Sequence, residues 1–169
     1  MIEPNRRGDV WVVAEQNDGA LHDVGLELLS KGRELARTLG VRLTAVLLGA
    51  KVAGIAERLI HCGADRVLVG EHPLLDHYQT NPYAKTVARL IEEHRPQVVV
   101  FGATPVGRDL APRVASAVWA GLTADCTDLR IGHHAESGTK KRYKNLLYQI
   151  RPAFGGNIIA TIVNPERIW

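Results

Sequence analysis

Short, predominantly apolar runs alternate with amphipathic helical patterns over the first two thirds of the chain. The apolar runs lie at residues 10–14, 43–48, 66–69 and 97–101, and helical periodicity follows them at residues 24–39, 52–62, 82–95 and 109–119. Strands of this kind, joined by helices of about ten residues or more, are typical of a parallel sheet that helices cover on both faces. We therefore predict the α/β class, as a three-layer domain with a mainly parallel sheet.

The length and composition fit a single domain over residues 1–169. A chain of 169 residues buries on the order of 70% of its unfolded surface in one core. It is 46% hydrophobic and 23% charged, as ordinary globular proteins are. Neither an internal repeat nor a linker divides the sequence, so we expect no second domain within it.

Capping residues and prolines predict where the helices begin and end. Asp23 stands at the expected N-cap of the first helix, and Gly40 follows its last turn. Asn81 is the expected cap of the third helix, which Pro82 would open. We expect the fourth helix to begin near Asp109, so that a proline three residues later lies in its first turn, where proline is tolerated.

Beyond residue 122 the helical period disappears, and strand character takes its place. Three segments, at residues 125–131, 143–151 and 157–163, carry alternating or β-branched residues. Gly155-Gly156 between the last two is a hairpin signal, and the charged stretch at 133–142 is predicted to be an exposed loop. The sequence therefore predicts a β-rich carboxy-terminal extension of the parallel sheet.

Charge and hydropathy argue against two large classes of partner. The 21 Lys and Arg are spread among 18 Asp and Glu rather than gathered in one stripe, so nucleic acid is not an expected partner. No apolar run approaches the roughly 18 residues of a membrane span. The two cysteines form no CxxC pair and the start has no signal or transit character, so we expect a cytoplasmic protein.

The segment GATPVGRDLAPRV, residues 102–114, leaves a predicted strand, passes two glycines and opens a helix. Its glycine spacing matches a P-loop, but Arg108 and Asp109 replace the Lys and hydroxyl residue that contact phosphates and Mg²⁺. One interpretation is a tight, well-capped turn, with Asp109 stabilising the first helical turn. The other is a recognition loop, in which amides near Thr104 and Gly107 and the Arg108 guanidinium meet a cofactor phosphate or a partner carboxylate.

No arrangement of residues in the sequence calls for catalysis. The histidines are scattered, and the adjacent pair His133-His134 would point to opposite sides of an extended segment. No GxSxG elbow is present, and no ATP-pyrophosphatase loop of the SGGxDS type follows the first strand. The residues therefore indicate a binding module rather than an enzyme.

Three segments together resemble the electron transfer flavoprotein alpha family, and its nitrogen-fixation-associated and bifurcating branch more than its mitochondrial one. They are VWVVAEQNDGALHDVGLELL from residue 10, GATPVGRDLAPRVASAVWAGLTADCTDL from residue 102, and RPAFGGNIIATI from residue 151. The resemblance implies the amino-terminal domain of the alpha subunit, with an adenine nucleotide alpha hydrolase-like fold.

The resemblance also implies cofactor and partners. In that family a carboxy-terminal domain of the alpha subunit carries FAD, and that domain is absent from these 169 residues. We therefore expect FAD in the parent complex and none in the isolated chain. The implied partners are the beta subunit, on which this domain packs, and the dehydrogenase or quinone oxidoreductase that the electron carrier serves.

Site residues can be carried over only where the motifs match. The resemblance and the loop pattern imply cofactor-binding positions at Thr104, Gly107 and Arg108, and partner-binding positions in the predicted hairpin at Arg151, Phe154, Gly155 and Asn157. The alternative is a stand-alone nucleotide-binding module similar to universal stress proteins. Their phosphate loop ends in Gly-Ser or Gly-Thr at a helix start, where this chain has Arg108-Asp109.

Overall fold

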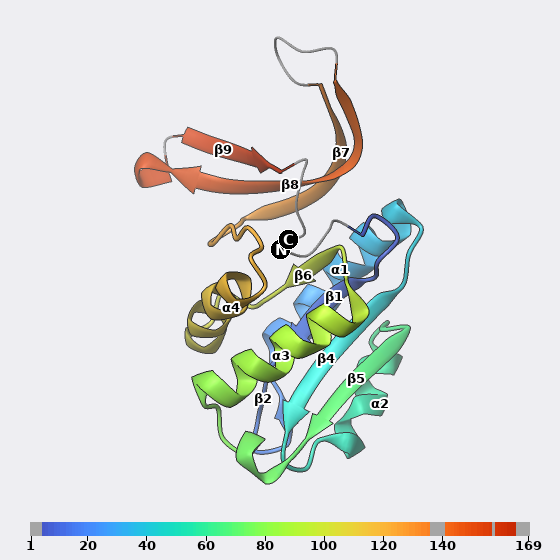
Figure 1. Ribbon diagram of the computed structural model, residues 1–169, viewed down its shortest axis with the longest axis vertical. Helices are drawn as coiled ribbons and strands as arrows, with labels where there is room; N and C mark the ends of the chain where they lie inside the picture. Colours follow the sequence, from blue (N-terminus) through green and yellow to red (C-terminus); the bar gives the residue numbers. More distant parts are fainter. Residues whose placement is uncertain (1–4, 136–140, 157, 165–169) are drawn as a thin grey trace.

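A computed structural model describes residues 5–135, 141–156 and 158–164 of the chain. It consists of a layered α/β core and an antiparallel sheet that stands at one end of it (Figure 1). No helix within the described ranges is long and apolar enough to cross a bilayer.

The core sheet is parallel throughout, as predicted. Its four strands are β1 (Val10–Ala14), β4 (Leu43–Gly49), β5 (Arg66–Glu71) and β6 (Val98–Val100), in the order β5-β4-β1-β6. Val12 at the centre of β1 pairs with Ala45 of β4 on one side and Val100 of β6 on the other. All five residues of β1 are buried, because the strand has neighbours on both edges and helices on both faces.

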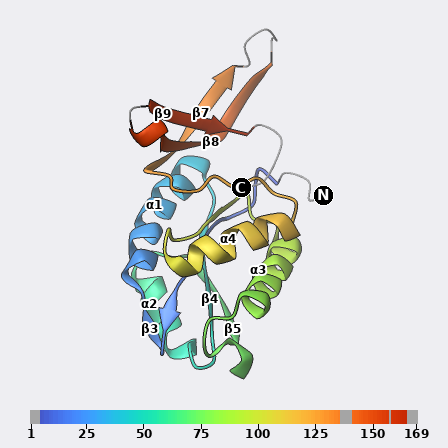
Figure 2. The same cartoon turned by 90° about the vertical axis from the view of Figure 1, so that its left-hand side faces the viewer.

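Two helices cover each face of this sheet (Figure 2). On one face α1 (Asp23–Leu39) and α2 (Ala53–His61) pack against Val10 and Val12. On the other face α3 (Thr80–His94) and α4 (Pro105–Ala117) pack against Trp11 and Val13. Alternate side chains of β1 thus enter two separate apolar clusters, which confirms the predicted three layers.

Two predicted helix caps are wrong. The N-cap of α1 is His22, whose Nδ1 accepts a hydrogen bond of 3.3 Å from the amide of Val24, so Asp23 is already helical. Helix α3 includes Thr80, so it begins one residue before the predicted cap Asn81. Gly40, by contrast, ends α1 in the left-handed conformation, with φ 69°, as predicted.

Helix α4 begins four residues earlier than predicted. Its N-cap is Thr104 and its first residue is Pro105, so Gly107 belongs to the helix rather than to the loop. Pro112 therefore lies in the helix interior, and the prediction that it occupies the first turn is wrong. A proline has no amide hydrogen to donate to the carbonyl of Arg108 one turn before it, so α4 lacks one internal bond.

The predicted β-rich extension is an antiparallel sheet, which we call the arm. Its strands are β7 (Asp128–Ala135), β8 (Arg142–Ala153) and β9 (Ile158–Val163), and β8 lies between the other two. The strand β7 extends over His133–Ala135, which the sequence had placed in a loop. The arm is attached to the core by Leu147, which packs in the cluster under α1, and by an ion pair of 3.2 Å between Lys31 and Asp128.

The interior proline of α4 generates a stability prediction. Replacing Pro112 with Ala restores an amide donor and removes a clash, so the free energy of unfolding should rise by about 1–3 kcal/mol. Pro105→Ala is the matched control, because proline at the first helical position costs little, and it should change stability far less. The measurement is guanidinium denaturation of the wild type and the two variants, which gives the free energy of unfolding of each. A loss of stability in Pro112→Ala would show that the proline itself is needed for packing of α4.

Candidate functional site

The carboxyl ends of β1 and β6 form the point at which the sheet changes direction. The chain runs from β1 outward to β4 and β5 and then returns to place β6 on the other side of β1. Helix α1 follows β1 on one face, and α4 follows β6 on the opposite face. Open α/β sheets bind their ligands at such a point, so the loops that follow β1 and β6 are the first candidate site.

Glu15, which follows β1, is bound to the loop that follows β6. The Thr104 hydroxyl lies 2.8 and 2.7 Å from the two carboxylate oxygens of Glu15 and donates to this carboxylate. The same hydroxyl oxygen accepts a bond of 3.0 Å from the amide of Gly107, which caps α4. A carboxylate of the chain itself therefore occupies the helix start at which an external anion would bind.

The two glycines of this loop are required by close approach of the backbone. A Cβ on Gly107 would lie 1.9 Å from the carbonyl oxygen of Gly102, and a Cβ on Gly102 would lie 2.7 Å from a carboxylate oxygen of Glu15. The space that the glycines leave is thus filled by the loop and by Glu15. The geometry is that of a tight, capped turn, the first of the two interpretations of this segment.

Other side chains of the chain fill the rest of the sheet's carboxyl edge. The Gln16 amide donates to the carbonyl of Leu48 at 3.2 Å. One carboxylate oxygen of Glu71 accepts from the amides of Val52 and Ala53, both at 2.9 Å, and so holds the start of α2. At the starts of α2 and α4 a carboxylate of the chain lies where a pyrophosphate would bind, so these two helix starts do not fit the phosphates of a flavin or nucleotide.

The sequence analysis placed Asp109 in the first turn of α4, but in the structure it lies in the second turn. Its carboxylate accepts hydrogen bonds from the hydroxyls of Tyr78 at 2.6 Å and Thr80 at 2.5 Å, and it pairs with Arg113 at 3.3 Å. The bonds from Thr80 and Tyr78 hold the pKa of Asp109 below its ordinary value. Burial, and then the Asp109 carboxylate, raise the pKa of Tyr78 to about 12. This network fastens α3 to α4.

Arg108 binds the segment that connects α4 to β7. Its Nε donates to the carbonyl of Ala103 at 3.1 Å, and its Nη2 pairs with Asp125 at 2.8 Å. Asp125 adopts a left-handed conformation with φ 57°, which is uncommon for a residue other than glycine. The side chain of Arg108 is 61% exposed, so this pair lies at the surface.

The same connecting segment lies beside β8 and brings a second arginine to this place. The amide of Thr127 donates to the carbonyl of Ile150 at 2.8 Å, next to Arg151. The thiol of Cys126 is partly buried, and this burial raises its pKa above the ordinary value. The charge of Arg151 opposes this increase, and the charge of Asp125 adds to it. Such a thiol is a poor nucleophile. Arg108 thus pairs with Asp125, and the charge of Arg151, 43 positions away from Arg108 in sequence, acts on the adjacent Cys126.

The rest of the predicted hairpin site can be described only in part. Gly155 and Gly156 have φ of 68° and 90°, so both occupy left-handed turn positions between β8 and β9, as the hairpin signal predicted. Asn157 and the side chain of Phe154 lie outside the described residues. The partner-binding role of this hairpin stays a prediction, as does the cofactor-binding role of Thr104, Gly107 and Arg108.

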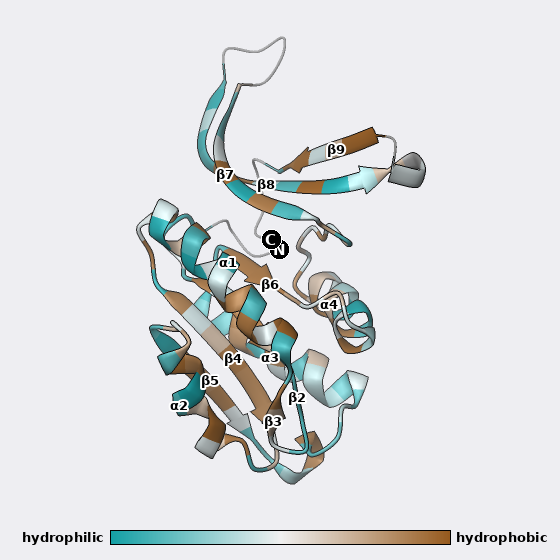
Figure 3. Ribbon diagram, turned by 180° about the vertical axis from the view of Figure 1, so that it is seen from behind, coloured by the Kyte–Doolittle hydropathy of each residue, from teal (hydrophilic) through white to brown (hydrophobic). Residues whose placement is uncertain are grey.

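The sequence analysis missed the exposed apolar side chains of β9 and of the segment that follows α4. Eight large hydrophobic side chains are exposed in the described ranges, and five of them lie on β9 or just after α4: Trp119, Leu122, Ile158, Ile159 and Ile162. We call these five residues the apolar arm surface. Figure 3 shows β9 as a mainly hydrophobic strand standing away from the core. The signal was present in the sequence IIATIV, which contains no charged residue.

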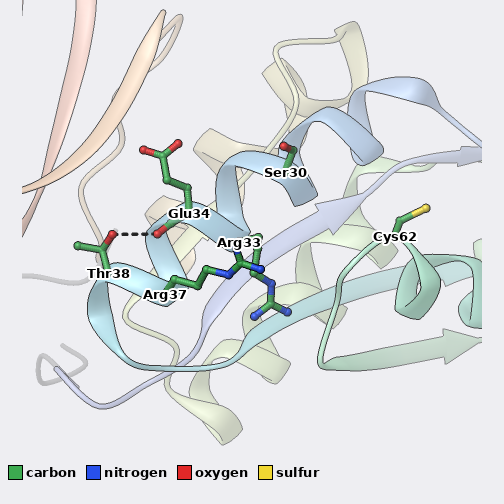
Figure 4. Close-up of a pocket in the computed structure, with 6 residues that line it drawn as sticks. All are labelled: Ser30, Arg33, Glu34, Arg37, Thr38 and Cys62. Carbon is green, nitrogen blue, oxygen red and sulfur yellow. Dashed lines mark hydrogen bonds between the residues drawn. The ribbon is translucent and has the colours of Figure 1, made fainter.

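A shallow depression lies on the outer side of α1, and its side chains do not converge on a common point as those of a binding site would. Ser30, Arg33, Glu34, Arg37, Thr38 and Cys62 line it. Arg33 pairs with Asp65 at 2.7 Å, and in Figure 4 the Cys62 thiol points away from both guanidinium groups. Across the described ranges, no three His, Cys, Asp or Glu side chains converge as metal ligands would.

The fold and these sites define an α/β domain whose sheet edge is filled by its own side chains and whose arm exposes an apolar edge strand. A family model of the electron transfer flavoprotein domain matches residues 10–169. The chain belongs to the electron transfer flavoprotein family.

Individual relatives agree with this family. The "Electron transfer flavoprotein subunit alpha" of Thermoanaerobacterium thermosaccharolyticum is 48% identical, over 94% of this chain and 45% of its own. "Protein FixB" of Clostridium saccharobutylicum is 49% identical, over 93% of this chain and 44% of its own. The chain therefore spans just under half the length of these relatives.

A solved universal stress protein from Archaeoglobus fulgidus is a distant structural neighbour. Its TM-score is 0.42 and its sequence identity 15%, over 62% of this chain and 91% of that one. This likeness is too weak to support a conclusion about function.

The close approach at Gly107 generates a second prediction. Gly107→Ala should lower the free energy of unfolding by about 3 kcal/mol or more, because the new methyl group overlaps a backbone carbonyl. Gly54→Ala is the control, since Gly54 lies in helix α2 with no atom within 4 Å of a Cβ there. That change should stabilise the domain by up to about 1 kcal/mol. If both variants unfold at the same denaturant concentration, the tight turn is not a structural requirement.

Proposed function

We propose that this chain is the amino-terminal scaffold domain of an electron transfer flavoprotein alpha subunit. The parent protein would be a heterodimeric, FAD-containing electron carrier between dehydrogenases and a redox acceptor. Family membership and the names of the relatives support this proposal. The observation that carries it is the uncovered edge strand β9, which is what a domain needs when it functions by docking on a partner.

Among the described strands, β9 is the last of the arm and is unpaired along one edge. Ile158 and Ile159 are adjacent, so they point to opposite faces of the sheet, yet they are 53% and 72% exposed. The described part of the domain therefore covers neither face of β9. A flat, uncharged edge strand of this kind pairs readily with another chain, which is the behaviour expected of one half of a heterodimer.

Trp119 extends this surface to the end of α4. It is 69% exposed and has φ 56°, and the following amide of Ala120 bonds back to the carbonyl of Ala115 at 2.9 Å. These bonds place Trp119 where glycine usually ends a helix, so a bulky side chain is held in a disfavoured conformation at the surface. Tryptophan is enriched among the residues that contribute most to binding at protein interfaces. In Figure 2, α4 and the arm face the same side of the molecule.

We further propose that the beta subunit is the partner that covers the apolar arm surface, and that residues 1–169 are one domain of a two-domain alpha subunit. The support is the length of the relatives, of which this chain matches just under half. FAD would then be held outside this chain, since the sheet edge is filled by Glu15, Gln16 and Glu71. The contribution of this chain to the electron carrier would be structural, without a catalytic step.

The alternative, a stand-alone nucleotide-binding module, requires a phosphate site at the start of α4. Thr104 and Glu15 fill that place, which favours the scaffold.

A purified sample tests both ideas together. We expect the isolated chain to be colourless after gel filtration, and calorimetry with ATP or AMP to show no binding tighter than about 10 μM. Stoichiometric flavin would contradict the proposed division of labour, and tight nucleotide binding would favour the stand-alone module.

Docking through β9 predicts a large effect of one surface substitution. Ile159→Asp introduces a charge at the most exposed apolar side chain of β9, so it should weaken binding of the beta subunit by about 2 kcal/mol or more, roughly thirtyfold in Kd. Stability of the isolated domain should change by less than about 0.5 kcal/mol, because the side chain is exposed. The measurement is a titration of the purified beta subunit, with circular dichroism to confirm folding.

Leu74→Asp is the matched control for this titration. Leu74 is also highly exposed, but it lies between β5 and α3, at the end of the domain opposite the arm (Figure 1). It should bind the beta subunit as the wild type does. Equal affinities for all three proteins would remove β9 from the interface, and no binding by the wild type would remove the scaffold proposal.

A further inference from the structure

The pairing of β8 with β9 determines which backbone groups face the open edge of the arm. Pro152 lies opposite Ile159, and a proline has no amide hydrogen to donate to a neighbouring strand. The carbonyl of Ile150 accepts from the amide of Thr127 at 2.8 Å, so it points to the β7 side. Because alternate residues of a strand bond to the same neighbour, the residues of β8 that bond to β9 are Gln149, Arg151 and Ala153.

The same alternation divides the residues of β9 into two sets. Three lie opposite the bonding residues of β8 and turn their backbone groups inward: Ile158, Ala160 and Ile162. The other three turn theirs to the edge that no described strand occupies: Ile159, Thr161 and Val163. The strand stands away from the core (Figure 3), so another strand can reach these three residues.

The outward-facing residues are spaced so that β9 matches a copy of itself. Two identical antiparallel strands are related by a two-fold axis. With Thr161 on that axis, it lies opposite the partner's Thr161, and Ile159 lies opposite the partner's Val163. Ala160 then lies opposite the partner's Ile162. Threonine pairs stabilise neighbouring strands, and β-branched residues fit a pleated surface. This register also bonds all three outward-facing residues, whereas a shift by one residue pair bonds only two of them within β9.

No side chain of β9 opposes such a pairing. Edge strands are usually protected from pairing with copies of themselves by charged residues, by proline or by a bulge. The strand IIATIV has no charge and no proline, and its pairing with β8 is regular over all six residues. The opposite edge of the arm differs, because β7 carries Asp128 and Arg130.

We propose that β9 pairs with β9 of a second copy of this chain, in a two-fold symmetric antiparallel ladder centred on Thr161. The ladder joins the two arms into one continuous sheet. About six backbone hydrogen bonds and a few apolar side chains form a small interface, so the Kd should be on the order of 10–100 μM. The proposal does not rest on the heterodimer function. The beta subunit, where it binds β9, competes with the second copy for the same edge.

Sedimentation equilibrium of the isolated chain tests the ladder and its register. The wild type should be a monomer at about 1 μM and mainly a dimer at about 500 μM. Thr161→Lys and Thr161→Glu should each stay monomeric at the higher concentration, because like charges would lie directly opposite each other. An equimolar mixture of the two variants should dimerise again, because the lysine of one then faces the glutamate of the other.

Leu74→Lys is the matched control. Leu74 is also exposed but lies between β5 and α3, far from the arm (Figure 1), so this variant should dimerise as the wild type does. Circular dichroism confirms the fold of each protein. The proposal is overturned if the wild type stays monomeric at about 500 μM, if either Thr161 variant dimerises alone, if their mixture does not dimerise, or if Leu74→Lys abolishes the dimer. The beta subunit is absent from these samples, so the result is separate from its binding.

Discussion

The hydrogen bonds between Glu15 and Thr104 determine how the rest of the domain is arranged. They join the end of β1 to the turn that starts α4, and the same hydroxyl caps that helix. With the turn fixed, α4 begins at Pro105 and presents Arg108 to Asp125 in the segment that leads to the arm. The carboxyl edge, where other open α/β sheets bind ligands, thereby serves internal support in this domain. The exposed apolar side chains that a partner could contact lie on β9 of the arm.

The arm leaves large apolar side chains exposed that the core of the domain would otherwise bury. A domain of this size can bury its apolar residues, and β1 shows that this one does. Yet β9 leaves isoleucines exposed on both faces, and Trp119 is held in a strained conformation at the surface. Such features reduce solubility in an isolated protein, so they support the proposal that a partner covers them.

The sequence predicted the architecture well because β1 and its neighbours are apolar on both faces and the helices are periodic. It failed at helix starts, where tertiary contacts decide: the ring of His22 caps α1, and Thr104, read as a loop residue, caps α4. The capped-turn interpretation was available, but the part of Glu15 was not, since it lies 89 positions from Thr104. Likewise, Arg108 and Asp125 are brought together only through folding. The exposure of β9 depends on strand order, which periodicity does not encode.

Hydrogen exchange of the domain, alone and bound to the beta subunit, tests the central claim most directly. The unpaired amides of β9 exchange freely in the isolated domain if the edge is open, and they should become protected when the partner adds to it. Amides near Thr104 and Gly107 should be unaffected, because they are already engaged within the domain. Protection centred on that turn, with β9 unchanged in a complex that has formed, would contradict the account.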